Sequence, residues 1–196
     1  MLGLPKATEL NKQLPKKAIY TKFKMNTAEK EKIDRDISRI MIVNEVSPSK
    51  VSLLAGEEVK SFFVMLVVLK RKDFSEKTII TLSKLIPQNM ILVLQYENKA
   101  KLAIDRSKLL QTEWKSINDF SIQMQGLDFD KVWENIILQV GGIHLENGNS
   151  LDEQIEINSQ KEKIKKEIER LEKQAWAEKQ PRKKFELVCK IKILKK

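Results

Sequence analysis

Residues 62–69 read FFVMLVVL, the longest apolar run in the chain. Successive side chains of an extended strand point to opposite faces, so both faces of this segment would be apolar. The two sets are Phe62, Val64, Leu66 and Val68 on one face and Phe63, Met65, Val67 and Leu69 on the other. This pattern is typical of a central strand in a sheet that is covered on both sides. The run is far shorter than the roughly 20 residues that a membrane-spanning helix needs.

Helices are predicted on either side of this strand. Asn26 and Glu29 form a capping-box pattern, and apolar residues at helical spacing predict a helix over about residues 27–44. A second helix follows Asp73 and ends before Pro87. A third is expected over about residues 128–140, where two glycines end it.

Further strands are predicted after the second helix. The segment NMILVLQY, residues 89–96, indicates a second buried strand. The polar tip ENK, residues 97–99, precedes the apolar AKLAI and predicts a hairpin. LLQTEW and FSIQMQ, residues 109–114 and 120–125, are weaker strand candidates.

The last 46 residues have a different composition, rich in Lys, Glu, Gln and Ile. A heptad-like seam runs through Ile157, Lys161, Ile164, Ile168, Leu171 and Ala175. Pro181 interrupts it, and an apolar stripe resumes with Phe185, Val188, Ile191 and Leu194. These patterns predict a coiled-coil-like helical hairpin joined near residues 177–181, whose short second helix needs a packing partner to be stable.

The predicted fold is therefore α/β or α+β, with a mixed β-sheet flanked by helices and a C-terminal helical hairpin. We expect a basic N-terminal arm over residues 1–14, the α/β domain over 15–142, a polar linker over 143–150 and the hairpin over 151–196.

The net charge of +10 lies at the two ends of the 196-residue chain. Residues 1–24 hold six Lys and one Glu, and residues 151–196 hold fourteen basic and nine acidic residues, so each end carries +5. Residues 25–150 hold seventeen of each sign and are neutral, which argues against a basic groove across the main domain. A single cysteine and the absence of a secretory signal pattern predict a cytoplasmic protein.

Several segments, in order along the chain, resemble the prokaryotic family called domain of unknown function 4391. They are LPKKAIYTKF, DFSEKTIITLSKLIPQNMILVLQYENKAKLAI, TEW, GLDFDKVWENIILQVGG and EKQPRKKFELVCKIKILKK. The family has no established activity, so the resemblance implies only a genomic context: such proteins tend to be encoded beside DNA methyltransferases and helicases of restriction-like defence modules. It therefore favours a helicase or DNA methyltransferase as the protein partner.

A metal-dependent nuclease is one alternative function. Restriction-type nucleases hold a divalent metal with two carboxylates and place a lysine two residues after one of them. Glu97 and Lys99 fit this short pattern, with Asp73 or Glu57 as the distant acid. The same residues are also ordinary for a polar hairpin tip.

No catalytic constellation and no cofactor motif stands out, so the main hypothesis is a non-enzymatic accessory protein that docks on a protein partner. The residues expected to bind this partner are Ile164, Ile168, Leu171, Trp176, Phe185, Val188 and Ile191. The competing hypothesis is direct nucleic-acid binding through the basic ends. Its residues are Lys16, Lys17, Lys22, Lys24, Arg182, Lys183 and Lys184.

Overall fold

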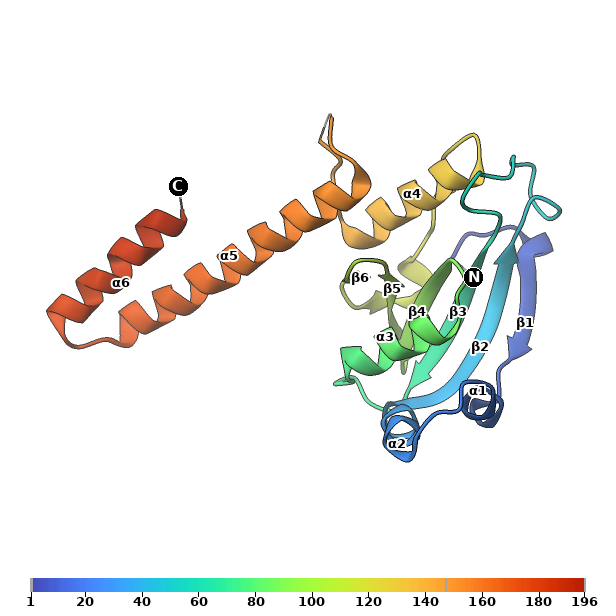
Figure 1. Ribbon diagram of the computed structural model, residues 1–196, viewed down its shortest axis with the longest axis horizontal. Helices are drawn as coiled ribbons and strands as arrows, with labels where there is room; N and C mark the ends of the chain where they lie inside the picture. Colours follow the sequence, from blue (N-terminus) through green and yellow to red (C-terminus); the bar gives the residue numbers. More distant parts are fainter. Residues whose placement is uncertain (1, 147, 196) are drawn as a thin grey trace. The chain divides into compact units, whose positions relative to one another are not determined.

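The computed structural model describes residues 2–146 and 148–195. It divides into two compact units, one up to Ile143 and one from His144 onward (Figure 1). The first unit contains a mixed sheet with flanking helices, and the second is a pair of helices. This confirms the predicted fold class in its α+β form. Among the described residues, no helix combines the length and apolar character needed to cross a membrane.

Seven strands form one sheet in the order β1-β2-β3-β4-β5-β6, with β7 paired to β5. Their bounds are β1 (Glu9–Gln13), β2 (Ile37–Val46), β3 (Phe62–Leu69), β4 (Met90–Tyr96), β5 (Lys99–Asp105), β6 (Leu109–Gln111) and β7 (Lys115–Ser116). β3 and β4 are parallel, and the other neighbouring strands are antiparallel. β3 is therefore an interior strand, as its two apolar faces predict.

The helices of the first unit cover both faces of the sheet. They are α1 (Lys16–Lys22), α2 (Thr27–Asp36), α3 (Glu76–Leu85) and α4 (Phe129–Gly141), with short 3-10 turns η1 (Lys6–Thr8) and η2 (Ile117–Asp119). On one face, Met65 and Val67 belong to a buried cluster with Ile33 of α2 and Ile79 of α3. On the other face, the ring of Phe62 lies 6.1 Å from that of Phe129 and 5.6 Å from that of Trp133.

The prediction of a helix over residues 27–44 is wrong for the second half of this range. α2 begins with the predicted capping box of Asn26 and Glu29 but ends at Asp36, and residues 37–46 form β2. This segment is rich in β-branched residues, which favour strands, and pairing with β3 buries Ile37 and Ile40 completely. The spacing of the isoleucines fits a helix equally well, so periodicity misled here.

The N-terminal segment is not a free arm, contrary to expectation. Residues 9–13 pair with β2 as an edge strand, and Leu2 and Leu4 are buried. All five residues of β1 are exposed and mostly polar, so the apolar pattern of a strand is absent from the sequence. LLQTEW forms a strand only over Leu109–Gln111, and FSIQMQ forms none.

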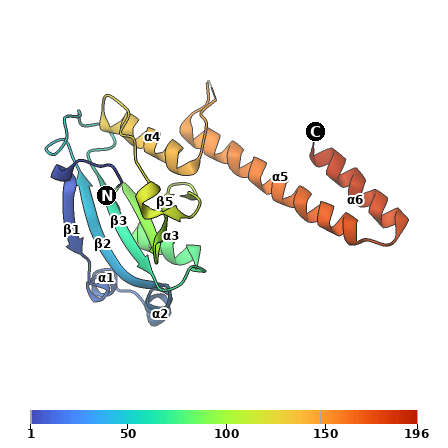
Figure 2. The same cartoon turned by 180° about the vertical axis from the view of Figure 1, so that it is seen from behind.

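In the second unit, α5 (Leu151–Ala177) and α6 (Pro181–Leu194) are joined by three residues. Ser150 and Glu153 form a capping box at the start of α5. Pro181 stands in the first turn of α6, where its missing N–H is no loss. α6 runs back along α5, which Figure 2 shows from behind.

Asp36 ties three elements of the first unit together. Its carboxylate is fully buried and accepts hydrogen bonds from the backbone N–H of Ser75 at 3.1 Å and the hydroxyl of Thr78 at 3.2 Å. Arg71 donates to the same carboxylate through Nε at 2.9 Å and also through Nη2. The end of α2 is thereby bonded to the loop after β3 and to the first turn of α3.

The replacement Asp36→Asn is expected to lower the free energy of unfolding by about 2 to 3 kcal/mol, because several bonds to a buried charge are weakened together. The measurement is urea unfolding at pH 7, followed by circular dichroism. The control is Asp34→Asn, whose side chain is 51% exposed in its pair with Lys16 and should change stability by about 1 kcal/mol or less.

The difference in stability between the wild type and Asp36→Asn should depend on pH. Burial raises the pKa of Asp36, but the bonds from Ser75, Arg71, Arg35 and Thr78 outweigh it and hold the pKa below its ordinary value. The stability from the charged carboxylate is thus present above the unfolded pKa of about 3.9 and is lost as the pH falls through the lower folded pKa. A stability difference that grew toward acid pH would contradict this assignment.

Asp130 in the first turn of α4 orders the loop before β3. Its carboxylate accepts the backbone N–H of Glu57 at 2.6 Å, of Glu58 at 3.2 Å and of Val59 at 2.7 Å. These bonds, that from Val59 foremost, lower the pKa of Asp130. A Cβ at position 56 would collide with this carboxylate, which explains the need for Gly56.

Replacing Asp130 with Ala should remove the protection of the Glu57 and Val59 amides against hydrogen exchange, because their acceptor is lost. Exchange followed by NMR at single residues is the measurement. Glu134→Ala is the matched control on α4, since Glu134 pairs with Lys131 at 2.7 Å on the same helix and its replacement should leave these amides protected. Unchanged protection in both variants would show that the clamp is unimportant.

Candidate interaction site on the helical pair

The contact between α5 and α6 is a short apolar seam. Leu171, Ala175 and Ile191 are buried in it, and Ile168, Leu187 and Leu194 pack against them. On α6 the inward residues are therefore 187, 191 and 194, at the spacing of one helix face. The expected stripe had Phe185 and Val188 on this face, and the structure places both outside the seam.

The seven residues predicted to bind a partner are divided by this seam. Leu171 and Ile191 are 5% and 8% exposed, and Ile168 is half-buried, so they are used mainly within the pair. The remaining four are exposed. They are Ile164, Trp176, Phe185 and Val188.

Trp176 lies beside a shallow hollow of about 400 Å³ between the two helices. Ala175 and Ile191 line the hollow together with Val188, and Glu172 and Lys184 lie at its border. The Trp176 side chain is 88% exposed.

Phe185, one turn before Val188 on α6, is 69% exposed. We name the surface formed by Ala175, Trp176, Val188 and Ile191 the Trp176 face. A large aromatic side chain such as Trp176 that remains this exposed beside an apolar hollow is typical of interaction sites.

α6, which supplies Val188 and Ile191 to the Trp176 face, is a basic helix. α6 carries five basic residues against one acidic residue, Glu186, so its net charge is +4. Glu186 lies 3.6 Å from Arg182, and Glu172 pairs with Lys195 at 2.8 Å. Among the described residues, Lys183, Lys184 and Lys192 have no carboxylate within ion-pair distance. Of these three, Lys184 lies at the border of the hollow and remains available to an acidic partner.

The basic residues proposed for nucleic acid belong to different units. Lys16 is held by Asp34 and by the carbonyl of Ile37, and Lys22 lies over the ring of Phe23 at 5.5 Å. Lys17 and Lys24 are exposed in the first unit, whereas Arg182, Lys183 and Lys184 are exposed in the second. Lys16 is thus already engaged within the first unit.

The residues of the nuclease alternative lie at two opposite ends of the sheet. β3 and β4 are parallel with Val68 opposite Gln95, so the loop holding Asp73 and the turn holding Glu97 and Lys99 leave the sheet at the same end. Glu57 precedes β3 and therefore lies at the opposite end of that strand. Within residues 2–146 and 148–195, no three His, Cys, Asp or Glu side chains are grouped to hold a metal ion.

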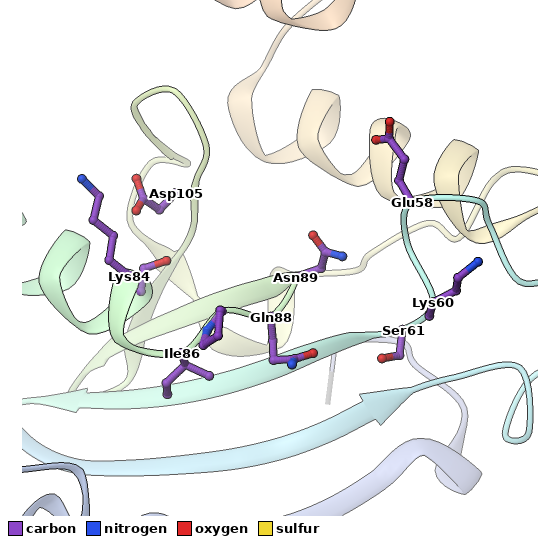
Figure 3. A pocket seen from close by; sticks show the side chains of 10 residues that line it. Glu58, Lys60, Ser61, Lys84, Ile86, Gln88, Asn89 and Asp105 are labelled. Atoms are coloured by element: carbon purple, nitrogen blue, oxygen red, sulfur yellow. The ribbon is translucent and has the colours of Figure 1, made fainter. Parts of the chain in front are cut away.

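A polar pocket of about 480 Å³ lies at that opposite end, beside the first residues of β3 and β4 (Figure 3). Lys84 and Asp105 lie close together at one end of it, and Glu58 and Lys60 lie at the other. Burial raises the pKa of Asp105, while Lys84 and Ser83 act in the opposite direction. Sequence patterns gave no sign of this pocket, because its residues come from separate segments.

The fold and the helical pair define an α+β protein with two antiparallel helices appended to its sheet domain. A family model described as domain of unknown function (DUF4391) matches residues 2–196, nearly the whole chain. The chain belongs to this family, which confirms the resemblance seen in the sequence. No curated protein and no solved structure matches the chain.

The seam predicts different effects for two neighbouring residues of α6. Leu187→Ala should destabilise the helical pair by about 1 to 2 kcal/mol, less than for a fully buried leucine, because it removes a partly buried contact. Limited trypsin digestion measures this as faster cleavage after Lys190 and Lys192. Val188→Ala, on the exposed side, is the control and should be digested like the wild type. Equal digestion of all three proteins would contradict the observed seam.

Proposed function

We propose that the protein is a non-enzymatic accessory protein that binds an acidic, amphipathic helix of a larger protein through the Trp176 face. The observation that supports this most directly is the exposure of Trp176 beside the apolar hollow. Tryptophan contributes large apolar area at low entropic cost and is enriched among residues that dominate binding energy. A helix laid into the groove between α5 and α6 would cover it.

The charge around the face selects among partners. Two copies joined symmetrically through α6 would bring charges of +4 and +4 together, which opposes self-association. A partner with acidic residues bordering an apolar stripe would instead be attracted by Lys184 and by the net positive charge of α6. We therefore assign the face to a foreign, acidic helix.

The family resemblance extends this proposal to a class of partner. It implies a helicase or DNA methyltransferase of a restriction-like DNA-processing or defence module, working in the prokaryotic cytoplasm. In such a module the protein would be associated with DNA through its partner. The +10 net charge is compatible with that setting.

The proposal is tested with a fluorescently labelled amphipathic peptide of alternating Leu-rich and Glu-rich faces, added to the full chain. Binding is followed by anisotropy. Trp176→Ala should weaken it by about 2 kcal/mol, roughly thirtyfold, because the main apolar anchor is removed. Val188→Ala should weaken it in the same direction, because Val188 lines the same hollow. Leu127→Ala is the matched control, since Leu127 is 85% exposed but lies in the first unit.

Two results would overturn the proposal. One is equal binding of a peptide in which every Glu is replaced by Lys, because charge would then play no part. The other is a wild-type dimer, detected by light scattering, that dissociates on Trp176→Ala, because the face would then serve a second copy of the chain.

A further inference from the structure

The face of the sheet that α3 covers becomes exposed to solvent at the end of β4 and the start of β5. Along β5, Ala103 is buried in the core cluster, but Lys101 is only partly buried and Lys99 is exposed. These three residues alternate along the strand and therefore share a face. Tyr96 of β4 lies opposite Lys99 and is partly exposed. Helical cover thus ends before the sheet does.

Two further aromatic rings border this uncovered part. Phe74, just before α3, and Trp114, just before β7, lie edge to face with ring centroids 6.5 Å apart. Both pack against the core cluster on one side and remain partly exposed on the other. Tyr96 does the same. The rings are therefore anchored while part of their surface meets solvent.

Lys101 lies among these rings. Its Nζ is 5.8 Å from the centroid of Phe74 and 5.3 Å from that of Trp114. It donates to Oε1 of Gln111 at 3.0 Å, and Gln111 donates in turn to Glu76 at 2.7 Å. Lys101 is thus fixed by a neutral amide, and among the described residues no carboxylate pairs with it.

We propose that this aromatic rim, made of Phe74, Tyr96, Lys99, Lys101 and Trp114, binds single-stranded nucleic acid. Unpaired bases stack on aromatic side chains whatever their sequence, and lysines beside the rings can bind the phosphates that connect the bases. The bases of a duplex are stacked on one another and cannot reach such rings. The rim therefore selects single strands through chemistry that DNA and RNA share.

The charges near the rim limit how much of the binding is electrostatic. Glu97 and Glu113 are exposed next to Tyr96 and Trp114 in sequence, and they offset part of the positive charge. Lys99 and Lys101 remain as phosphate contacts within the rim. Lys72 is exposed two residues before Phe74 and is counted as a third, since Arg71 is bound to Asp36. Three contacts at about 0.7 each on a single strand give a log-log salt slope near −2.

The test uses the full chain and fluorescently labelled 20-nucleotide oligo(dT), oligo(U) and a DNA duplex, with binding measured by anisotropy at several salt concentrations. We expect both single strands to bind more tightly than the duplex. Trp114→Leu should weaken binding about tenfold or more through lost stacking. Trp114→Phe should retain most of the affinity for single strands, because phenylalanine also stacks on bases. If Trp114 only packed the core, Leu and Phe at this position would not be expected to differ in oligonucleotide affinity.

Lys99→Glu provides a variant that should fold normally, because Lys99 is exposed. It should weaken binding, whereas Lys163→Glu on α5, also exposed, should not. If Lys163→Glu or reversal of Arg182 and Lys183 weakened binding and Lys99→Glu did not, the basic helices would be the binding site and this inference would be wrong. Absence of binding to either oligonucleotide, or equal affinity for the duplex, would also overturn it.

Trp176→Ala should leave oligonucleotide binding unchanged, which separates this site from the Trp176 face.

Discussion

Water is excluded from both faces of β3, where Phe62, Val64 and Val67 have no exposed surface. Each buried side chain of this size contributes about 1.5 to 3 kcal/mol, so leaving either face open would forfeit much of the stability of the first unit. The cluster around Val67 includes residues of α1, α2 and α3, and the rings of α4 cover Phe62 from the other side. The element order follows from this requirement, since α3 both covers one face and makes the long connection that the parallel pair β3 and β4 needs.

The carboxylates of Asp36 and Asp130 add hydrogen bonds between elements that apolar packing brings together. Asp36 bonds the end of α2 to the start of α3, and Asp130 bonds the start of α4 to the loop that leads into β3. Apolar packing is largely non-directional, whereas these hydrogen bonds specify where each helix starts relative to the sheet. The loop after β3 and the aromatic rim beside α3 therefore rest on a rigid base. The same polar contacts leave the Trp176 face untouched, because it belongs to the other unit.

Sequence patterns predicted the elements that have a strong local signal and missed those that depend on distant partners. β3, α3, α4 and the helical pair carry long apolar runs or clear caps. The spacing of Ile37 and Ile40 fits both a helix and a strand, so the sequence alone predicts a longer helix here. Only pairing with β3 makes this segment the strand β2. β1 had no apolar signal because all its residues are exposed. On α6, steps of three residues suggested Val188, but Leu187 is the residue that packs into the seam. Trp176 stands among charged residues in the sequence, in keeping with its exposure, and its binding of a partner stays a prediction. The rim around Lys101 assembles residues from four segments that share no motif.

α5 has 27 residues and α6 has 14, so about half of α5 extends beyond its neighbour. At 1.5 Å per residue, the uncovered half spans about 20 Å between the first turn of α5 and the part that α6 covers. Within the second unit, this length sets the distance from the first turn of α5 to the Trp176 face. Each inserted or deleted residue would shift the Trp176 face by about 1.5 Å along the helix axis and rotate it by about 100°. Loss of a single residue would therefore rotate the face by more than a quarter turn relative to the first turn of α5.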